Sequence, residues 1–296
     1  MLPVASQTIS HSAAGFALRP LASDVGVEVL GLDLWRALDR GTFKAVRDVC
    51  QTHGVILIRG QSLTEEKQVA FARNFGPLAS VPNRNSGQAN ARSSASLISN
   101  VRDQGRLIGS LGCGPLLFHF DECYAERPCK SALLYGIEVP GEGGETIFAD
   151  MRRAYEALPP DLAHAIEGRH ALNVFDVEEE GHYGKSAIDL YSTIPADVKR
   201  FSHPIVRSDP VSGRKSLFVN RCMTLCVEGM ERSESDALLL RLFEHQEQVC
   251  FQYAHRWRVG DLIMWDNRRT LHARRDFPSW KRRILRRVTV LDDAAA

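Results

Sequence analysis

The sequence predicts a mainly β protein, with antiparallel strands in a barrel or sandwich and helices packed on its outside. Strand-like segments dominate the middle and the end of the chain, where the residues that could carry chemistry also lie. Helical patterns precede these strands or fall between them. The 296 residues contain no internal repeat and no low-complexity linker, so we expect a single domain over residues 1–296.

The beginning of the chain should form short strands and two helices. Residues 16–35 alternate in polarity and turn at glycines, as short strands do. Residues 42–52 have a helical pattern and lead to VILIRG (55–60), a short buried strand. The sequence Ser62-Leu-Thr-Glu65 is a capping box, which predicts the start of a helix that continues to about Phe75.

The rest of the chain is expected to be rich in strands. Strands are predicted at residues 96–101, 130–139, 145–149, 216–220, 261–266 and 282–290. Helices are predicted at residues 151–168, with a break at Pro159 and Pro160, and at residues 232–248. Residues 79–95 and 102–117 are polar or rich in glycine and should be irregular, and residues 176–200 should form a lid.

The composition excludes several function classes. The chain is 44% hydrophobic and 25% charged, and its net charge of +1 gives no field that would attract nucleic acid or a membrane surface. The N-terminal residues lack the pattern of a signal peptide, and no apolar run approaches the roughly 20 residues of a membrane span. Seven cysteines without a CxxC pair fit reduced thiols. We therefore expect a cytoplasmic protein with no nucleic-acid or membrane partner.

Two histidines stand two residues before an acid, in His119-x-Asp121 and in His245-x-Glu247. Chance supplies about one such pair in a chain of this composition, so the motif alone is weak. His245 and Glu247 lie on a predicted helix, where residues two apart point in different directions, and we interpret them as surface polar residues. His119 and Asp121 lie on a predicted strand, where residues two apart point to the same side.

A metal needs at least a third ligand, and His272 is the best candidate. Two histidines and one carboxylate on one face of an octahedral ion leave three positions open, which is the facial triad of non-haem Fe(II) oxygenases. The open positions can take a bidentate 2-oxo acid and dioxygen. Taken alone, His119 is more often a hydrogen-bonded histidine than a ligand, and the other residues of the set decide the interpretation.

A 2-oxo acid such as 2-oxoglutarate brings a distal carboxylate, which requires a cationic partner with a hydroxyl beside it. Arg283 and Arg287 lie four residues apart on a predicted strand and share one face, and Thr146 can supply the hydroxyl. The alternative is a solvated basic strand. We expect that state for Arg282 and Arg286, which have the opposite parity.

These motifs together resemble the TauD/TfdA family of taurine-dioxygenase-like Fe(II)/2-oxoglutarate oxygenases. The residues that carry the resemblance are His119-x-Asp121, Gly143-Gly144-Glu145-Thr146, Trp265-Asp266-Asn267, His272 and Arg283-x3-Arg287. It extends from about residue 16 to the last predicted strand and includes the segments NFGPL (74–78) and HPIVRSDPVSGRKSLFVN (203–220). The resemblance implies a double-stranded β-helix (jelly roll) with flanking helices.

The resemblance also implies roles for individual residues. His119, Asp121 and His272 would bind the catalytic Fe(II), and Thr146 and Arg283 would hold the distal carboxylate of the co-substrate 2-oxoglutarate. The prime substrate would lie near Arg287, Phe118, Phe175 and Met223. The implied reaction is hydroxylation, by dioxygen, of a small anionic substrate such as a carboxylate, sulfonate or sulfate ester. Cleavage of a C–O, C–N or C–S bond follows where the hydroxylated carbon bears that heteroatom.

Taurine itself is not the expected substrate. Pro115 stands where taurine enzymes of the family carry Asn, and Met223 stands where they carry Phe. Residues 79–95 lack the His and Tyr that line the taurine pocket. We expect a larger and more apolar organic acid, and His182 and Tyr183 of the predicted lid are either near it or solvated. The oligomeric state is open, and a homo-oligomer is compatible with the sequence.

Two other function classes remain open from the sequence. A zinc hydrolase could use His119, Asp121 and His272 around a water, but it gives no reason for Arg283 and Thr146. A non-catalytic binding protein on the same fold would be expected to lack a metal ligand or the arginine for 2-oxoglutarate, and neither is missing here.

Overall fold

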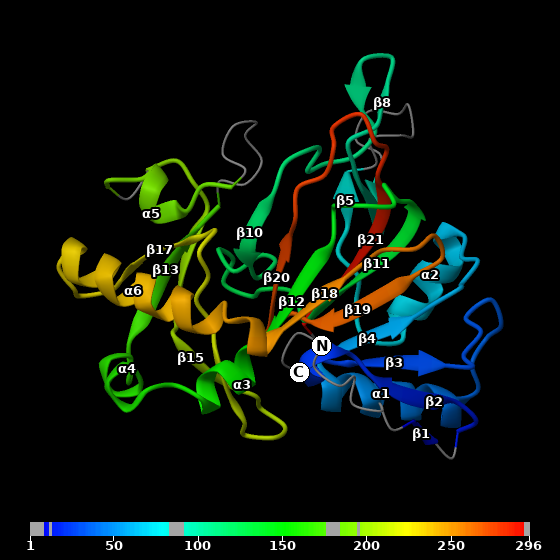
Figure 1. Ribbon diagram of the computed structural model, residues 1–296, viewed down its shortest axis with the longest axis horizontal. Helices are drawn as coiled ribbons and strands as arrows, with labels where there is room; N and C mark the ends of the chain where they lie inside the picture. Colours follow the sequence, from blue (N-terminus) through cyan, green and yellow to red (C-terminus); the bar gives the residue numbers. More distant parts are fainter. Residues whose placement is uncertain (1–8, 12–13, 83–91, 176–183, 194–195, 293–296) are drawn as a thin grey trace, which may run out of the picture.

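The computed structural model describes residues 9–11, 14–82, 92–175, 184–193 and 196–292, and it is mainly β with several helices (Figure 1). The larger sheet has eight strands in the order β1-β2-β3-β4-β19-β11-β21-β7. Their bounds are Ser10–His11 (β1), Ala17–Pro20 (β2), Val27–Leu30 (β3), Val55–Ile58 (β4), Leu262–Asp266 (β19), Ser131–Glu138 (β11), Ile284–Val290 (β21) and Ala95–Ser99 (β7). Neighbouring strands are antiparallel except β3 and β4.

A four-stranded antiparallel sheet packs against one face of the larger sheet. Its order is β10-β20-β12-β18, with bounds Leu116–His119 (β10), Thr270–Arg274 (β20), Thr146–Asp150 (β12) and Gln252–His255 (β18). Successive strands from β10 to β12, and again from β18 to β21, alternate between the two sheets. This alternation brings strands that are far apart in the sequence, such as β10 and β20, into direct pairing.

Both faces of the larger sheet are buried, which explains why its central strands are almost continuously apolar. Alternate residues of each strand face opposite sides. The residues that face the smaller sheet include Val55, Leu57, Ala132, Leu134, Ile263, Trp265 and Leu285. Their neighbours face helices α1 (Arg40–His53) and α2 (Glu65–Arg73), and they include Ile56, Ile58, Leu133, Leu262, Met264 and Val288.

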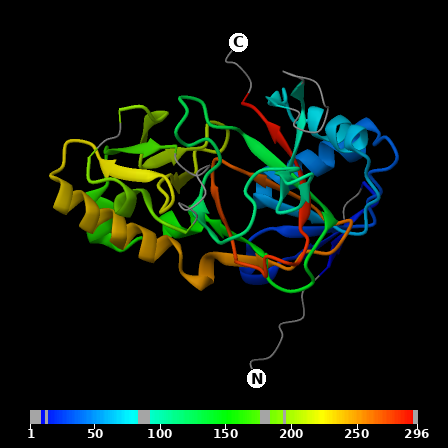
Figure 2. The same cartoon turned by 90° about the horizontal axis from the view of Figure 1, so that it is seen from above.

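A second lobe is built from the chain between β12 and β18 and lies beside the two sheets (Figures 1 and 2). It contains the sheet β14-β13-β17 (Arg200–Pro204, His170–Val174 and Thr224–Val227) and the hairpin β15-β16 (Val206–Ser208 and Lys215–Leu217). Its helices are α3 (Met151–Glu156), α4 (Pro160–Ala165), α5 (Ala187–Leu190) and α6 (Arg232–Gln246). They enclose a separate hydrophobic cluster that includes Phe120, Phe218, Met223 and Phe243.

The remaining elements are short. They are the strand pairs β5-β6 (Val81–Pro82 and Arg92–Ser93) and β8-β9 (Arg102–Asp103 and Arg106–Leu107), and the 3-10 helices η1 (Ala22–Asp24) and η2 (Val249–Phe251). No helix among the described residues is both long enough and apolar enough to cross a membrane. Within the predicted lid, residues 176–183, which include His182 and Tyr183, lie outside the described residues.

Three local predictions away from the metal cavity were wrong. Helix α2 begins at Glu65 with Thr64 as its N-cap, because the Thr64 side chain, and not that of Ser62, accepts a hydrogen bond from the Lys67 amide. Arg286 is buried, since helix α2 covers its side of β21. His245 is also buried, and its Nε2–H donates to the Ala154 carbonyl of α3 at 2.8 Å.

Candidate active site

Two buried histidines face each other across neighbouring antiparallel strands. His119 on β10 and His272 on β20 are register partners, and their ring centroids lie 4.1 Å apart. The exposed fractions of the two residues are 6% and 7%. Side chains directly opposite on paired strands share one face, so the strand pairing alone places both rings on the interior side of the small sheet.

Asp121 completes a three-residue cluster, although it does not lie on the strand. β10 ends at His119, and Asp121 stands in the following turn, where Glu122 has a positive φ of 57°. The predicted strand alternation is therefore wrong in this detail. The Asn267 side chain holds the turn instead, because it accepts from the Asp121 amide at 2.9 Å and donates to the Asp121 carbonyl at 2.8 Å.

The cluster has the geometry of a metal site. One ligand atom each from His119, Asp121 and His272 can be chosen so that all lie within 4.8 Å of one another. The Asp121 Oδ1 atom is 3.9 Å from His119 Nε2 and 3.8 Å from His272 Nε2. The Nδ1–H of His119 donates to the Leu117 carbonyl at 2.8 Å, which leaves the Nε2 lone pair for a metal. The buried Asp121 Oδ2 has no hydrogen-bond partner among the described residues.

The protonation states also suit a metal. Burial lowers the pKa of His119, and burial together with the neighbouring His119 lowers the pKa of His272 to about 3. Burial alone would raise the pKa of Asp121, but His272, Arg287 and His119 outweigh it and lower that pKa. At neutral pH the site therefore presents two neutral imidazoles and one carboxylate, which are the forms that bind a divalent cation.

Arg283 is a buried cation without an acidic partner among the described residues. Its exposed fraction is 2%, its Nε has no partner, and its Nη2 donates to the Gly144 carbonyl at 3.4 Å. Burial, assisted by the nearby Arg274, lowers the pKa of Arg283 to about 9. Gly144 has a φ of +67°, and a Cβ there would lie 3.2 Å from the Arg283 Nε, so glycine leaves room for this approach. A buried unpaired guanidinium of this kind calls for an anionic ligand.

Thr146, which carries a hydroxyl, lines the same cavity as Arg283. It is buried on β12, and its Oγ1 accepts from the Trp257 indole N–H at 3.0 Å. A hydroxyl that already accepts one hydrogen bond keeps its own proton for another partner. Thr146 is paired in register with Arg274 of β20, two residues after His272.

A small cavity joins these groups. It has a volume of about 40 Å³ and is lined by both histidines, Asp121, Thr146, Arg274, Arg283 and Arg287, with an apolar wall that includes Leu134 and Trp265. The Arg287 Nη1 lies 3.6 Å from the Asp121 Oδ1. The structure thus brings together six of the nine residues that the sequence singled out, from strands of both sheets, from the position just before β21 and from the turn after β10.

Phe118, Phe175 and Met223 do not line this cavity. Phe118 alternates with His119 on β10, and all three belong to the hydrophobic cluster of the second lobe. The Phe175 ring lies 4.4 Å from the ring of Tyr124, and the Met223 Sδ is 3.9 Å from the Cys123 Sγ. They therefore lie beside the turn that carries Asp121.

Three site residues were not singled out as functional from the sequence. Asn267 was named only as part of the Trp265-Asp266-Asn267 motif that carries the resemblance, and its contacts with Asp121 appear only in three dimensions. Trp257 follows β18, the strand that pairs with β12, and donates to Thr146. No sequence motif that we recognised includes Trp257. Arg274 had a usable signal, since it lies two residues after His272 on one strand and so shares its face.

Comparisons with known proteins agree with this geometry. The model of the "Taurine catabolism dioxygenase TauD, TfdA family" matches residues 17–289. The chain is 36% identical to the alpha-ketoglutarate-dependent 2,4-dichlorophenoxyacetate dioxygenase of Cupriavidus pinatubonensis, over 94% of this chain and 97% of that protein. It is 32% identical to the (S)-phenoxypropionate/alpha-ketoglutarate-dioxygenase of Sphingobium herbicidovorans, over 95% and 96%.

Solved structures give the same result. A taurine dioxygenase from Burkholderia xenovorans superposes with a TM-score of 0.76 at 27% identity, covering 94% of this chain and 90% of that one. The structure of AAD-2 in complex with Mn(II) and N-oxalylglycine superposes with a TM-score of 0.74 at 30% identity, covering 94% and 98%. The chain therefore belongs to the TauD/TfdA family, and with it to the non-haem iron dioxygenases that depend on 2-oxoglutarate.

Proposed function

We propose that this enzyme oxidises a small organic carboxylate with an apolar, aromatic body. The observation that carries the reaction class is Arg283, a buried cation that lines the same cavity as His119, Asp121 and His272. A hydrolytic zinc site has no use for such a cation, whereas a 2-oxo acid that chelates a metal brings a carboxylate to it. The relatives named for 2,4-dichlorophenoxyacetate and (S)-phenoxypropionate support the class of prime substrate.

The proposed roles follow from the contacts. His119, Asp121 and His272 hold Fe(II), and Arg283 with the Thr146 hydroxyl holds the distal carboxylate of 2-oxoglutarate. When bound, the iron supplies the activation of dioxygen that is coupled to decarboxylation of 2-oxoglutarate to succinate and CO2. The protein's residues contribute orientation: Asn267 fixes the backbone of Asp121, and the Leu117 carbonyl fixes the ring of His119.

Arg287 is the proposed partner of the substrate's acidic group. Its side chain is 26% exposed and its Nε has no partner among the described residues, so it can contact both Asp121 and a second anion. Phe118 and Phe175 are only partly buried near the Asp121 turn, so their apolar surfaces suit an aromatic body next to that anion, and the buried Met223 packs in the cluster behind them. A hydroxyl placed on a carbon that bears an ether oxygen gives a hemiacetal, which collapses with C–O cleavage.

We also infer that the two facing sheets form a double-stranded β-helix and that the chain is one oxygenase domain. The alternation of successive strands between the sheets supports the first inference. The chain leaves the small sheet after β12, forms the second lobe and returns to the same sheet at β18, which pairs with β12. The second lobe is thus an insertion between two paired strands, which supports a single domain.

An anaerobic titration tests the reaction class. The apo-protein is titrated with Fe(II) and then with 2-oxoglutarate, and the visible charge-transfer absorption of the chelate is recorded. We expect a band that requires both additions in the wild type and that is absent in Asp121→Ala, with circular dichroism showing that the variant is folded. A wild-type protein that binds metal but gives no band would contradict the proposal.

The substrate class is tested by succinate release under air. Phenoxyacetate, a simple aliphatic carboxylate and taurine are compared as prime substrates. We expect succinate formation with phenoxyacetate to exceed that with taurine. Equal or greater succinate formation with taurine would refute the aromatic-carboxylate proposal while leaving the reaction class intact.

A further inference from the structure

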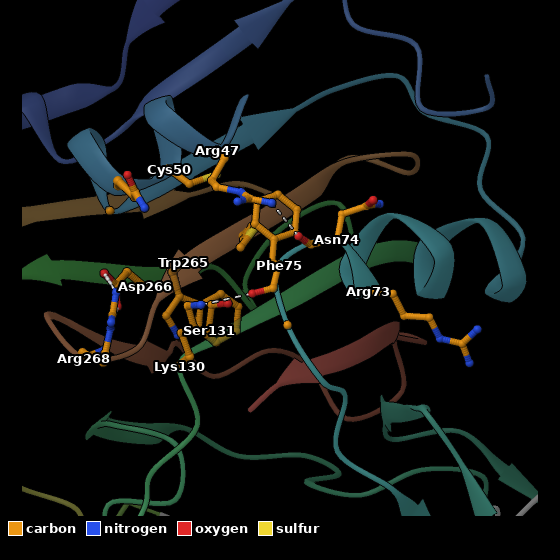
Figure 3. Close-up of a pocket in the computed structure, with 14 residues that line it drawn as sticks. Arg47, Cys50, Arg73, Asn74, Phe75, Lys130, Ser131, Trp265, Asp266 and Arg268 are labelled. Atoms are coloured by element: carbon orange, nitrogen blue, oxygen red, sulfur yellow. Dashed lines mark hydrogen bonds and ion pairs between the residues drawn. The ribbon is translucent and has the colours of Figure 1, made fainter. Parts of the chain in front are cut away.

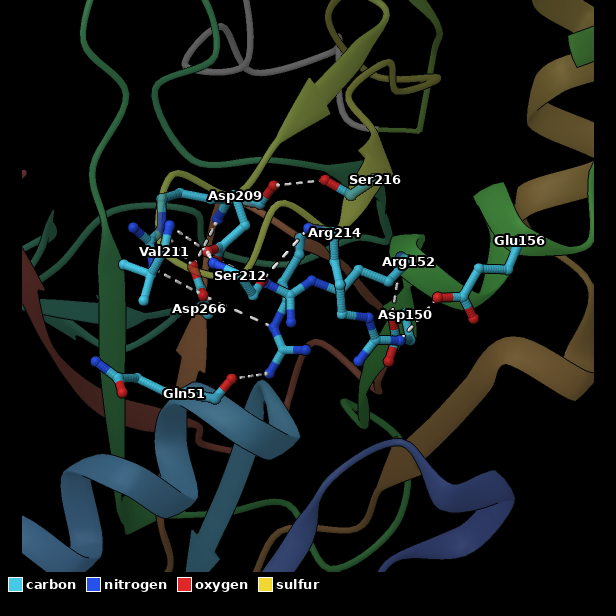
Figure 4. A network of polar contacts seen from close by, with 12 residues as sticks. Gln51, Asp150, Arg152, Glu156, Asp209, Val211, Ser212, Arg214, Ser216 and Asp266 are labelled. Carbon is cyan, nitrogen blue, oxygen red and sulfur yellow. Dashed lines mark hydrogen bonds and ion pairs between the residues drawn. The ribbon is translucent and has the colours of Figure 1, made fainter.

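Several arginines of this fold use their guanidinium groups to hold distant segments together. Arg47 of α1 donates to the Asn74 carbonyl after α2 at 3.2 Å (Figure 3). Arg152 of α3 pairs with Asp209 at 2.6 Å (Figure 4). Arg274 of β20 is buried like Arg152, but it lines the metal cavity. The segment that Arg274 holds can therefore influence how a ligand fits that cavity.

Arg274 holds residues 111–114, which precede β10 and are called the 111–114 wall below. Its Nη1 donates to the Leu111 carbonyl at 2.5 Å, and its Nε and Nη2 donate to the Gly114 carbonyl at 3.0 Å and 2.6 Å. Just before the wall, the Ser110 amide donates to the Leu97 carbonyl of β7 at 2.9 Å. Because β7 belongs to the larger sheet and β20 to the small one, the wall connects the two sheets beside the cavity.

Leu111 has a backbone conformation that is unfavourable for a leucine. Its φ is 53°, in the left-handed region that favours glycine. A residue with a side chain stays in that region only where its surroundings fix it, and such residues are frequent at functional sites. The hydrogen bond from Arg274 to the Leu111 carbonyl is one such fixing contact. Leu111 lines the metal cavity together with Ile98, so the strained residue supplies apolar surface to the site.

The contacts of Arg274 place the wall at one particular end of the cavity. Arg274 lies two residues beyond the metal ligand of β20 and is the register partner of Thr146. Its Cζ lies 5.5 Å from the centre of the Phe277 ring, and the Arg283 Cζ lies 5.8 Å from the same centre. The Leu111 carbonyl, which Arg274 holds, therefore lies at the Thr146 and Arg283 end of the cavity.

We propose that Leu111, held by Arg274, limits the length of the 2-oxo acid that the cavity accepts. The inference rests on the proposed function, in which Arg283 and Thr146 hold the distal carboxylate of 2-oxoglutarate. A 2-oxo acid that chelates the metal at one end and reaches Arg283 at the other must fit between them. A chain longer by one methylene would press its distal end against the 111–114 wall. Arg274 acts through Leu111 and is thus a positioning residue.

Calorimetric titration of the Mn(II)-loaded protein tests the length limit. The ligands are 2-oxoglutarate and 2-oxoadipate, which is longer by one methylene, and the readout is the ratio of their Kd values. The wild type should bind 2-oxoglutarate at least about tenfold more tightly, the discrimination typical of one methylene. Leu111→Gly should lower this ratio to less than about threefold, because it removes the side chain of the wall. Glycine adopts a φ of 53° freely, so this variant should keep the backbone of the wall.

A second variant tests the role of Arg274. Arg274→Met keeps an unbranched side chain but removes the donors that hold the wall, so it should lower the same ratio. Arg275→Met, at the exposed neighbouring residue, is its matched control. Gln104→Gly is the matched control for Leu111→Gly, because Gln104 has a φ of 46° in the exposed turn between β8 and β9. Both controls should keep the ratio within about twofold of the wild-type value.

The possible outcomes separate this inference from the proposed function. Urea unfolding of each variant shows whether the fold is retained, and Leu111→Gly tests the wall even where Arg274→Met lowers stability. An unchanged ratio in Leu111→Gly would overturn the length limit, as would a wild type that binds both acids equally. A ratio that falls in Leu111→Gly but not in a folded Arg274→Met would overturn the role of Arg274. If Arg283→Gln bound 2-oxoglutarate as tightly as the wild type, the proposed role of Arg283, on which the inference rests, would be wrong instead.

Discussion

Some residues of the metal cavity are held by hydrogen bonds, whereas others have buried polar atoms without a hydrogen-bond partner among the described residues. His119 and Asp121 are oriented by hydrogen bonds to their ring nitrogen and backbone. Arg283, in contrast, is buried beside Arg274 with only a long contact to Gly144. A buried cation without an anion lowers the stability of a folded protein, and in the role proposed for Arg283 the carboxylate of 2-oxoglutarate would offset this cost.

Replacing each of the two cavity arginines, Arg283 and Arg287, should therefore raise the KM of a different ligand. Arg283→Gln should raise the KM for 2-oxoglutarate about 100-fold, the loss expected when one partner of a buried charge pair is removed. Arg287→Gln should raise mainly the KM for the prime substrate. Initial rates of succinate formation with each ligand varied in turn would measure both effects. The reverse pattern would show that the two roles are interchanged.

A matched variant controls for the loss of positive charge next to the start of β21. Arg282 precedes Arg283 but is exposed and contacts Glu138 at 2.8 Å. Arg282→Gln should leave both KM values within about twofold, because exposed ion pairs contribute little. A large change in this variant would mean that the field of the basic segment, and not a specific contact, controls ligand affinity.

At this scale the sequence predicts the identity of the clustered residues better than their surroundings. His119, Asp121, Thr146, His272, Arg283 and Arg287 gather as expected. Strand parity correctly separates Arg287 from Arg286, but parity does not tell whether a helix covers the other face. Arg286 is buried for that reason, under α2, and its Nη2 donates to the Leu63 carbonyl at 2.7 Å.

At the scale of elements, the contact between α2 and β21 explains that burial. The Arg286 Nε donates to the Gln68 Oε1 at 2.7 Å, and the Gln68 Nε2 donates to the Arg286 carbonyl at 3.1 Å. Gln68→Leu should lower the free energy of unfolding by about 3 kcal/mol, since it leaves a buried guanidinium and a buried carbonyl with fewer partners. Urea unfolding would measure the change.

The double variant tests the explanation. Gln68→Leu combined with Arg286→Met replaces both polar partners by apolar groups, so it should recover part of the loss seen in Gln68→Leu alone. Simple addition of the two single-variant losses would show that the pair is not coupled and that Gln68 acts only by packing.

The turn between β19 and β20 links two elements to the metal ligands. Its Asn267 is fully buried, and its Nδ2 donates to the carbonyls of Asp121 and Cys129. Asn267→Asp keeps the shape but removes both donors, so the Asp121 turn should shift and Fe(II) affinity should fall about 10- to 100-fold. Metal content after dialysis against graded Fe(II), together with the 2-oxoglutarate charge-transfer band, would report the change.

A neighbouring residue provides the control for this turn. Arg268 has a half-buried side chain that contacts Asp266, and it makes no contact with Asp121. Arg268→Gln should keep the Fe(II) affinity, with a small loss of stability. Equal losses of affinity in Asn267→Asp and Arg268→Gln would indicate that the whole turn, and not the contact with Asp121, positions the metal.

Sequence patterns predicted the long central strands but not several short ones. β11 and β19 are mostly apolar, and β21 has apolar residues on both sides of Arg286 and Arg287, so these strands were expected as strands buried on both faces. β13, β14 and β17 are only four or five residues long and pair mainly with one another in the second lobe. Such strands depend on tertiary pairing more than on local preference, so their sequences carry little signal.

At the scale of the whole molecule, alternation between two sheets explains why the site could be anticipated but not constructed from the sequence. His119 and His272 become neighbours only because β10 and β20 pair in the small sheet. Arg283 and Arg287 approach them from the larger sheet. The pairing of sheets is a property of the complete chain, so the sequence could suggest that these residues meet without giving their register.

The same burial that shapes the core predicts how stability responds to acid. Burial lowers the pKa of five histidines, namely His53, His119, His203, His255 and His272. Below their ordinary pKa of 6.5 these histidines bind protons in the unfolded chain but remain neutral in the folded chain. The free energy of unfolding therefore falls as pH drops below about 6.5, by at most about 1.4 kcal/mol per pH unit for each histidine. Burial raises the pKa of Glu122 and Glu247, which has the opposite effect on stability, but these two groups are fewer than the five histidines.

Urea unfolding of the metal-free enzyme at pH 7 and pH 5.5 would measure the effect, with lower stability expected at pH 5.5. His203 is the most informative position, because it is buried, donates to the Ala125 carbonyl, and lies outside the metal cluster. His203→Gln should keep that hydrogen bond and reduce the loss of stability between the two pH values. His164→Gln, at a side chain that is 89% exposed, should not reduce it. An equal pH dependence in wild type and His203→Gln would show that this histidine does not contribute to the acid sensitivity of the fold.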